Sequence, residues 1–137
     1  MVTVMQIQNG PTPRPRMAIK SGGRILFIDP REIIAVEAER NYVFLHQRTG
    51  SHLLRESISR MTERLEPYGF VRIHRSVAIN VAFVEEIHRW PTGEHVLKLR
   101  GGKEYTVTRT YRKNLRLMAT SWIPTQLFAD EPRIGSV

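Results

Sequence analysis

"FVRIHRSVAIN", residues Phe70 to Asn80, is followed directly by "VAFVEEI", residues 81–87, and the two form one of the most apolar regions of the chain. Arg72, His74, Arg75 and Ser76 interrupt it. Two apolar runs around a basic, hydroxyl-bearing break allow two interpretations. The segment is either core with accidental polar residues, or a buried scaffold that holds those residues out towards a partner. The rest of the chain has to decide.

The length and composition predict one globular domain. The chain has 137 residues, of which 41% are hydrophobic and 25% charged, values that argue against wholesale disorder. It has no cysteine, which excludes a disulfide framework, a thiolate metal site and a cysteine nucleophile. No apolar stretch approaches the ~20 residues of a membrane span, and the N-terminus does not read as a signal peptide. We therefore expect a cytoplasmic protein.

The charge is strongly basic. Twenty-one Lys and Arg against thirteen Asp and Glu give a formal charge of +8 and a pI near 10.6. Only four of the basic residues are lysines, and arginine suits bidentate recognition of phosphates and guanine edges. A genomic codon bias towards arginine explains the excess equally well. The composition is therefore compatible with a polyanionic partner, but it does not distinguish a nucleic acid from an acidic protein.

Closely spaced apolar runs predict antiparallel hairpins. The first hairpin turns at Ser21-Gly22-Gly23, where glycines supply positive φ. The β-branched run "EIIAVEA" (residues 32–38) and the alternating run "YVFLHQ" (42–47) follow, separated by a short break. Further strands are predicted at "SHLLRE", at "VAFVEEIHRW", at "HVLKLR" and at "YTVT".

Two segments change to helical period. Ile58, Met61 and Leu65 lie three and four residues apart, after Ser57 as a candidate N-cap, and Pro67 with Gly69 ends the helix. This short helix is expected to pack on a sheet, not to read a groove. A second helix is predicted from Arg109 to Met118, with Leu115 and Met118 inward.

The two ends of the chain differ from its centre. Residues 1–17 contain "GPTPRPR" and are expected to be a proline-rich linker or arm. Residues 120–137 form a tail with no clear period. Its large apolar residues are expected to pack on the domain or on a second copy; they are Trp122, Ile123, Leu127 and Phe128.

Catalytic, metal-binding and cofactor-binding residues are not apparent. The five histidines are scattered without the spacing of a metal pair, and "SGG" and "GGK" are hairpin turns, not phosphate loops. Glu37 and Glu39 share a strand face, where we expect them to lie near a sheet edge and to repel neighbours or pair with arginine. We therefore expect no enzyme activity.

Two basic segments favour a nucleic-acid partner. No acidic residue occurs from Gly69 to Phe83, or within residues 105–120, and apolar runs anchor both segments. Such segments can present donors to phosphates while the core fixes their geometry. Asn41 and Tyr42 lie in a break between strands, where an amide or phenol can reach a base edge or a phosphate. For Asn41 alone, a turn residue in the left-handed region is the better explanation.

Three stretches, "IIAVEAERNYVFLH", "FVRIHRSVAINVAFVEEI" and "YTVTRTYRKNLRLM", occur in an order and spacing that resembles the LytTR (LytR/AlgR) family of bacterial DNA-binding domains, over Met17 to Met118. The resemblance implies a mainly β fold, with short antiparallel sheets stacked around one core and one or two short helices. It implies a sequence-specific, double-stranded DNA-binding transcription regulator, usually the output half of a two-component response regulator. Loops, not a recognition helix, enter successive major grooves. Residues 18–119 would form this domain.

The resemblance also implies base contacts from three places. These are the loop containing Asn41 and Tyr42, then Arg75 after the histidine of "RIHRS", and Arg109 at the start of the final helix. A guanidinium can pair with O6 and N7 of guanine, which suits the two arginines to base contacts.

Four more residues are expected to contact phosphates: His74, Ser76, Arg112 and Lys113. Asn80 is expected to stabilise a turn and not to touch DNA. The interrupted apolar stretch is then a scaffold whose polar residues face DNA.

The resemblance also bears on the organisation of the whole protein. A receiver domain with its phosphoacceptor aspartate is absent from the 137 residues, so the chain is expected to be an excised output domain or a stand-alone version. By analogy with the family, two copies are expected on tandem half-sites of a promoter.

The alternative to a DNA-binding regulator is a basic protein-interaction module without sequence-specific DNA binding.

Overall fold

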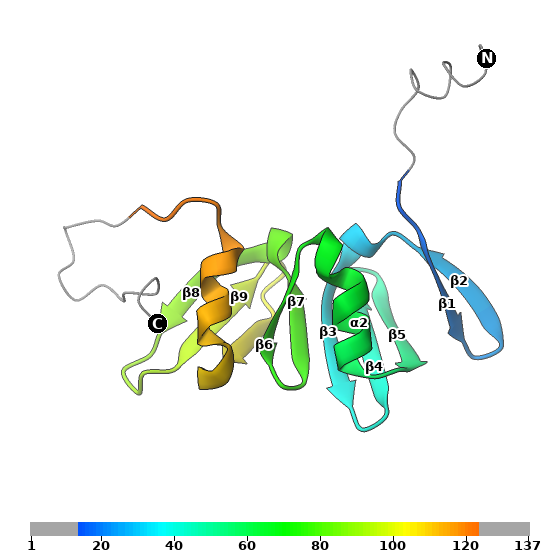
Figure 1. The fold of residues 1–137 in the computed structure, drawn as a ribbon, viewed down its shortest axis with the longest axis horizontal. Helices are drawn as coiled ribbons and strands as arrows, with labels where there is room; N and C mark the ends of the chain where they lie inside the picture. Colours follow the sequence, from blue (N-terminus) through cyan, green and yellow to red (C-terminus); the bar gives the residue numbers. More distant parts are fainter. Residues whose placement is uncertain (1–13, 124–137) are drawn as a thin grey trace, which may run out of the picture.

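The computed structural model describes residues 14–123, which form three antiparallel sheets (Figure 1). The first is a hairpin of β1 (Met17–Ser21) and β2 (Arg24–Ile28). The central sheet has the order β5-β4-β3-β7-β6 and the third the order β10-β9-β8. Their bounds are β3 Ile33–Glu39, β4 Tyr42–Gln47, β5 Gly50–Arg55, β6 Phe70–His74, β7 Val77–Asn80, β8 Val84–Arg89, β9 His95–Leu99 and β10 Glu104–Val107.

Helical segments connect or cover these sheets. They are α2 (Ile58–Leu65) and four 3₁₀ helices: η1 (Pro30–Glu32), η2 (Glu66–Tyr68), η3 (Val81–Phe83) and η4 (Arg109–Met118). The helix predicted over residues 109–118 is therefore a 3₁₀ helix. Within residues 14–123, no helix is long and apolar enough to cross a membrane.

Turn chemistry sets the first two hairpins. Gly22 and Gly23 adopt φ of 58° and 79°, as expected for a two-residue turn with positive φ. In the β3–β4 turn the left-handed residue is Arg40, with φ of 58°, and not Asn41. The left-handed expectation for Asn41 was wrong, because Glu39 pairs with Tyr42 and the strained conformation falls on the first of the two turn residues.

The central sheet is buried on both faces. Neighbouring β3 residues point in opposite directions, so Val36 joins one apolar cluster and Ala35 the other. The first cluster includes the β1–β2 hairpin and Met61 and Leu65 of α2. The second includes residues of β9, β10 and Leu115 of η4. The mainly β fold class with stacked antiparallel sheets is confirmed. The single core that was expected is divided into two clusters, because the central sheet buries a face on each side.

The elements follow one another along the long axis of the molecule. The β1–β2 hairpin lies at one end, the central sheet with α2 in the middle, and the three-stranded sheet with η4 at the other end (Figure 1). The N-cap of α2 is Ser57, as predicted, because its Oγ accepts a 3.1 Å hydrogen bond from the Arg60 amide. Gly69, with φ of 90°, terminates η2.

Candidate nucleic-acid interface

Two turns of the central sheet lie next to each other. β3 pairs with β7 in antiparallel register, with Glu37 opposite Val77. The Ala38 amide donates a 2.8 Å hydrogen bond to the Ser76 carbonyl. The β3–β4 turn (residues 40–41) and the β6–β7 turn (75–76) therefore share one end of the sheet, the lower side of Figure 1.

The start of η4 joins them. The Thr108 amide donates a 3.0 Å hydrogen bond to the Ile73 carbonyl of β6. Farther along η4, Asn114 Nδ2 donates to the Arg72 carbonyl at 2.8 Å. These bonds hold η4 along β6, so Arg109 begins the helix close to the β6–β7 turn. The structure thus brings together the three places that the sequence indicated.

Arg72 holds the β6–β7 turn from inside. Its Nε donates to the His74 carbonyl at 3.0 Å, and its Nη2 donates to the Arg75 carbonyl. Its guanidinium also lies over the Tyr111 ring of η4, 5.7 Å from the centroid. The turn is fixed on the helix, while the Arg75 side chain stays exposed. Sequence reasoning placed Arg72 in a basic segment but assigned it no role, because no local pattern predicts these contacts.

His74 and Ser76 bind each other within the turn. The Ser76 amide donates to His74 Nδ1 at 3.0 Å. Because Nδ1 accepts this bond, Nε2 is the ring nitrogen that carries a proton in neutral His74. The amide of Ser76 is therefore occupied, and its hydroxyl and the His74 Nε2–H are the groups available to an outside partner.

The β3–β4 turn presents polar side chains to solvent. Arg40, Asn41 and Tyr42 are exposed, and Tyr42 is 41% accessible. Arg55, the last residue of β5, pairs with Tyr42 and is also exposed. Arg40 and Arg55 were not among the sequence-derived candidates. Arg55 lies thirteen residues after Tyr42 in the chain. Only the pairing of β4 with β5 brings the two residues side by side.

The basic residues of η4 divide into two kinds. Arg109 and Lys113 are exposed. Arg112 is half-buried, and its Nη2 donates to the Gly93 carbonyl of the β8–β9 turn at 3.2 Å. Its Nε is buried without a hydrogen-bond partner among the described residues. Arg112 therefore helps to hold the β8–β9 turn, a structural role that the sequence did not indicate.

The positive charge of this surface is not neutralised locally. Within residues 14–123, no carboxylate lies within 4.0 Å of the guanidinium or ammonium groups of Arg40, Arg55, Arg75, Arg109 or Lys113. We call these five residues the basic row. An exposed basic surface without acidic partners attracts polyanions and releases their counterions on binding.

A buried histidine, His95, lies near Arg112 and Arg89. His95 is 3% exposed, and burial, followed by the charges of Arg112 and Arg89, lowers its pKa. The burial and the two guanidinium groups thus favour the neutral form of His95. Its Nδ1 has no hydrogen-bond partner in the described part of the chain.

The main cluster of ionisable side chains elsewhere joins two sheets. Glu37 Oε2 accepts a 2.5 Å hydrogen bond from the Tyr105 hydroxyl and lies 3.1 Å from Lys103 Nζ and 2.9 Å from His46 Nε2. The expectation that Glu37 lies near a sheet edge and pairs with arginine was wrong. β3 is the middle strand, and the partners come from the neighbouring strand and from the stacked sheet.

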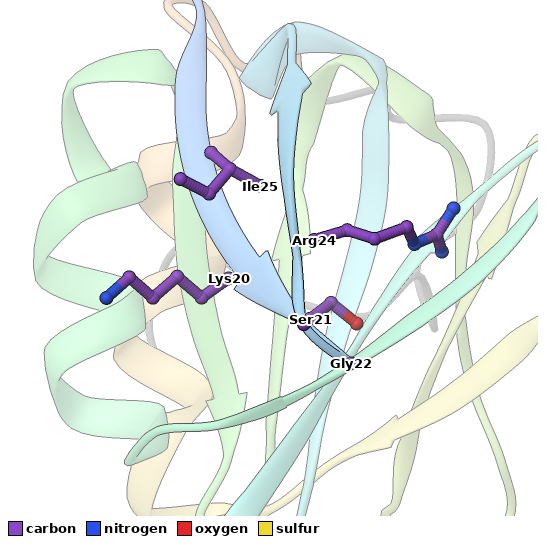
Figure 2. A pocket seen from close by; sticks show the side chains of 6 residues that line it. Lys20, Ser21, Gly22, Arg24 and Ile25 are labelled. Atoms are coloured by element: carbon purple, nitrogen blue, oxygen red, sulfur yellow. The ribbon is translucent and has the colours of Figure 1, made fainter.

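Among residues 14–123, no group of three or more metal-ligating side chains is found. A shallow hollow at the β1–β2 turn is lined by Lys20, Ser21, Gly22, Gly23, Arg24 and Ile25. In Figure 2 the Lys20 and Arg24 side chains point away from each other, so they do not converge on a ligand.

Comparison with known proteins identifies several relatives. The sensory transduction protein LytT of Bacillus subtilis is 27% identical over 109 residues, which cover 80% of this chain and 45% of LytT. The transcriptional regulatory protein LytR of Staphylococcus aureus is 24% identical over 100 residues, 73% of this chain and 41% of LytR. The transcriptional regulatory protein YpdB of Escherichia coli is 29% identical over 94 residues, 68% of this chain and 38% of YpdB. The chain thus spans less than half the length of these relatives.

A solved structure shares the fold. The LytTr DNA-binding domain of a response regulator from Bacillus cereus superposes with a TM-score of 0.66 at 17% identity, covering 77% of this chain and 97% of that one. A model of the LytTr DNA-binding domain family matches residues 23–120. The chain therefore belongs to the LytTR family, and it carries a LytTr DNA-binding domain.

Proposed function

We propose that this chain is a sequence-specific, double-stranded DNA-binding module of a transcription regulator, which reads the major groove through loops. One observation carries the proposal. Two turns and the start of η4 form a single exposed row of arginines without carboxylate partners. Intramolecular bonds anchor two of these elements, so their side chains meet DNA in a preorganised arrangement.

Within this row, Arg75 and Arg109 read bases. Both are exposed. A guanidinium at the tip of a turn or at the start of a helix can reach O6 and N7 of guanine in the major groove. Asn41 and Tyr42 approach a base edge or the adjacent backbone from the β3–β4 turn.

The remaining candidates contact the phosphate backbone. Lys113 is exposed on η4 and acts as a point charge. His74 and Ser76 offer a ring N–H and a hydroxyl from the β6–β7 turn. Arg112 contributes through the face of its guanidinium that does not bind Gly93. Arg40 and Arg55 add charge at the other end of the row. No catalytic step is part of the proposed function.

Residues 18–119 form the proposed DNA-binding unit, between a linker or arm over residues 1–17 and a tail over 120–137. One copy reads a short half-site. Two copies would occupy the two tandem half-sites of a promoter.

A binding titration tests the proposal. The full chain is incubated with a randomised duplex pool at two salt concentrations, and the selected sequences are read out. A short repeated motif that survives the higher salt is the expected result. Binding that disappears with salt and enriches no sequence would overturn it and favour the alternative, a basic surface that binds an acidic protein.

Single variants then test the residue roles on the selected site. Arg75→Ala and Arg109→Ala are each expected to cost ~1–3 kcal/mol and to relax specificity at one position. Lys113→Ala and Arg112→Ala are expected to weaken all duplexes similarly and to lower the salt slope. Arg48→Ala is the matched control, because Arg48 is an exposed arginine in the β4–β5 turn at the opposite end of the sheet. Unchanged binding by Arg75→Ala and Arg109→Ala would refute the base-contact assignment.

A further inference from the structure

The β8–β9 turn, residues 90–94, lies beside the start of η4. Register pairs Arg89 with His95, and His95 with Val107, the last residue of β10. The turn and the beginning of η4 therefore share one end of the three-stranded sheet. The 3.2 Å bond from Arg112 to the Gly93 carbonyl ties them directly. In Figure 1 the β8–β9 turn lies beyond η4 at the lower side of the molecule, where the β3–β4 and β6–β7 turns also lie.

The turn is closed by its own backbone. The Trp90 amide donates to the Glu94 carbonyl at 2.8 Å, and the Gly93 amide donates to the Trp90 carbonyl at 2.8 Å. Gly93 has φ of 93°, a left-handed conformation that favours glycine. Together with the bond from Arg112, these contacts hold the turn in one shape.

The turn exposes an aromatic ring beside a free guanidinium. Trp90 is 52% accessible, although indole is among the largest apolar side chains. Arg89 is exposed and has no carboxylate within 4.0 Å among the described residues. The Glu94 side chain, 3.5 Å from Thr92 Oγ1, is the acidic group of the turn itself. The turn therefore presents an exposed indole and an exposed guanidinium from two consecutive residues, Trp90 and Arg89.

We propose that the β8–β9 turn is a further DNA-contacting element, in which Arg89 pairs with a phosphate and the Trp90 indole packs against the adjoining sugar–phosphate backbone. This inference rests on the proposed function, because it extends the same row by one turn. Arg89 carries the charge that a phosphate requires, and an indole offers an apolar face for a deoxyribose and an N–H donor for a phosphate oxygen. Such contacts position the protein without reading sequence.

Tryptophan fluorescence tests the contact directly. The chain has two tryptophans, so Trp122→Phe leaves Trp90 as the only reporter. Titration of this variant with the selected duplex is expected to change the Trp90 emission with the same midpoint as binding measured by anisotropy of a labelled duplex. The reciprocal Trp90→Phe variant, which reports from Trp122, shows whether any change is specific to the turn. Saturated DNA binding with unchanged Trp90 emission would overturn the inference.

Affinity measurements supply the second readout. Arg89→Ala and Trp90→Ala are each expected to weaken the selected duplex and an unrelated duplex by the same factor, about 3- to 10-fold, as a positioning contact should. Arg89→Ala should also lower the salt slope by about 0.9, the value for one phosphate. Arg48→Ala should change neither quantity. Thermal unfolding of each variant verifies that the domain stays folded, as expected for exposed side chains.

Failure of this inference is distinguishable from failure of the proposed function. If the proposed function is wrong, the parent chain selects no duplex sequence. If only the inference is wrong, the unsubstituted chain selects a DNA site and the Arg75→Ala variant no longer binds that site tightly. The Arg89→Ala and Trp90→Ala variants then bind the site as tightly as the unsubstituted chain.

Discussion

The hydroxyl of Tyr105 donates a 2.5 Å hydrogen bond to Oε2 of Glu37, 68 residues earlier in the chain. This bond links β10 of the three-stranded sheet to β3 at the centre of the five-stranded sheet. Burial and the neighbouring carboxylate raise the pKa of Tyr105, so the phenol remains a donor. The contact helps to set how the two sheets stack, and thereby where η4 and its arginines lie.

Glu37→Gln is expected to lower the free energy of unfolding near pH 7 by about 1 kcal/mol, since the carboxylate is only partly buried. Burial opposes the charge of Glu37, but the Tyr105 hydroxyl and Lys103 lower its pKa below the usual 4.5. A depressed carboxyl pKa contributes stability above the unfolded value, and this contribution is lost as pH falls through the folded value.

Urea unfolding of parent and variant from pH 7 to pH 3 measures this effect. The difference in stability between the two proteins should shrink below about pH 4.5, where unfolded carboxyls gain protons. A difference that does not depend on pH would show that the Glu37 charge contributes nothing.

His95 predicts a second pH dependence, in a higher range. Its lowered pKa means that the unfolded chain binds a proton before the folded chain as pH falls below 6.5. Stability should therefore fall from pH 7.5 towards pH 5, by ~1.4 kcal/mol for each pKa unit of depression. His46, whose pKa burial and Lys103 also lower, contributes in the same range.

His95→Gln tests this contribution. The variant should show a flatter loss of stability between pH 7.5 and pH 5 than the parent, whatever its stability at pH 7.5. Chemical unfolding at four pH values in that range is sufficient. Parallel curves for the two proteins would contradict the prediction.

Arg72→Lys keeps the charge of Arg72 but cannot span two carbonyls and the Tyr111 ring as a guanidinium does. The β6–β7 turn should loosen, and affinity for the selected duplex should fall about tenfold, equivalent to ~1.4 kcal/mol. Affinity for an unrelated duplex should change little, because the charge is retained. Anisotropy titrations on both duplexes measure this difference, and an equal loss on both would indicate a direct phosphate contact instead.

Asn80→Ala should destabilise the fold without a specific defect in DNA recognition. Asn80 is 2% exposed, and its Nδ2 donates to the Ile33 carbonyl at 2.9 Å and the Arg31 carbonyl at 3.3 Å. Its Oδ1 accepts from the Ala82 amide at 3.0 Å, which caps η3. The predicted turn-stabilising role is thus confirmed.

Leaving these buried groups unpaired is expected to cost ~1–3 kcal/mol of unfolding free energy. Asn80→Asp should be similarly harmful, because a carboxylate cannot donate to the Ile33 carbonyl. Thermal and urea unfolding measure the loss. A stable Asn80→Ala variant would contradict this assignment.

The sequence by itself determined the local structure. The Gly22–Gly23 turn, the Ser57 cap and the Met61–Leu65 stripe of α2 occur as predicted. Each depends on residues within a few positions of one another, where backbone preference and side-chain period act directly. The basic stretch around Arg75 and the run from Arg109 were also visible in the sequence, because the absence of acidic residues is a local property.

Only the tertiary structure decided which of these residues lie together and which remain free. It separated exposed Lys113 from half-buried Arg112, gave Arg72 its role inside the β6–β7 turn, and brought the β8–β9 turn beside η4. It also placed β3 next to β7 and Glu37 against Tyr105. The physical reason is that periodicity gives each strand an inner face but does not specify its neighbours, which are chosen by packing and hydrogen bonding between distant parts of the chain.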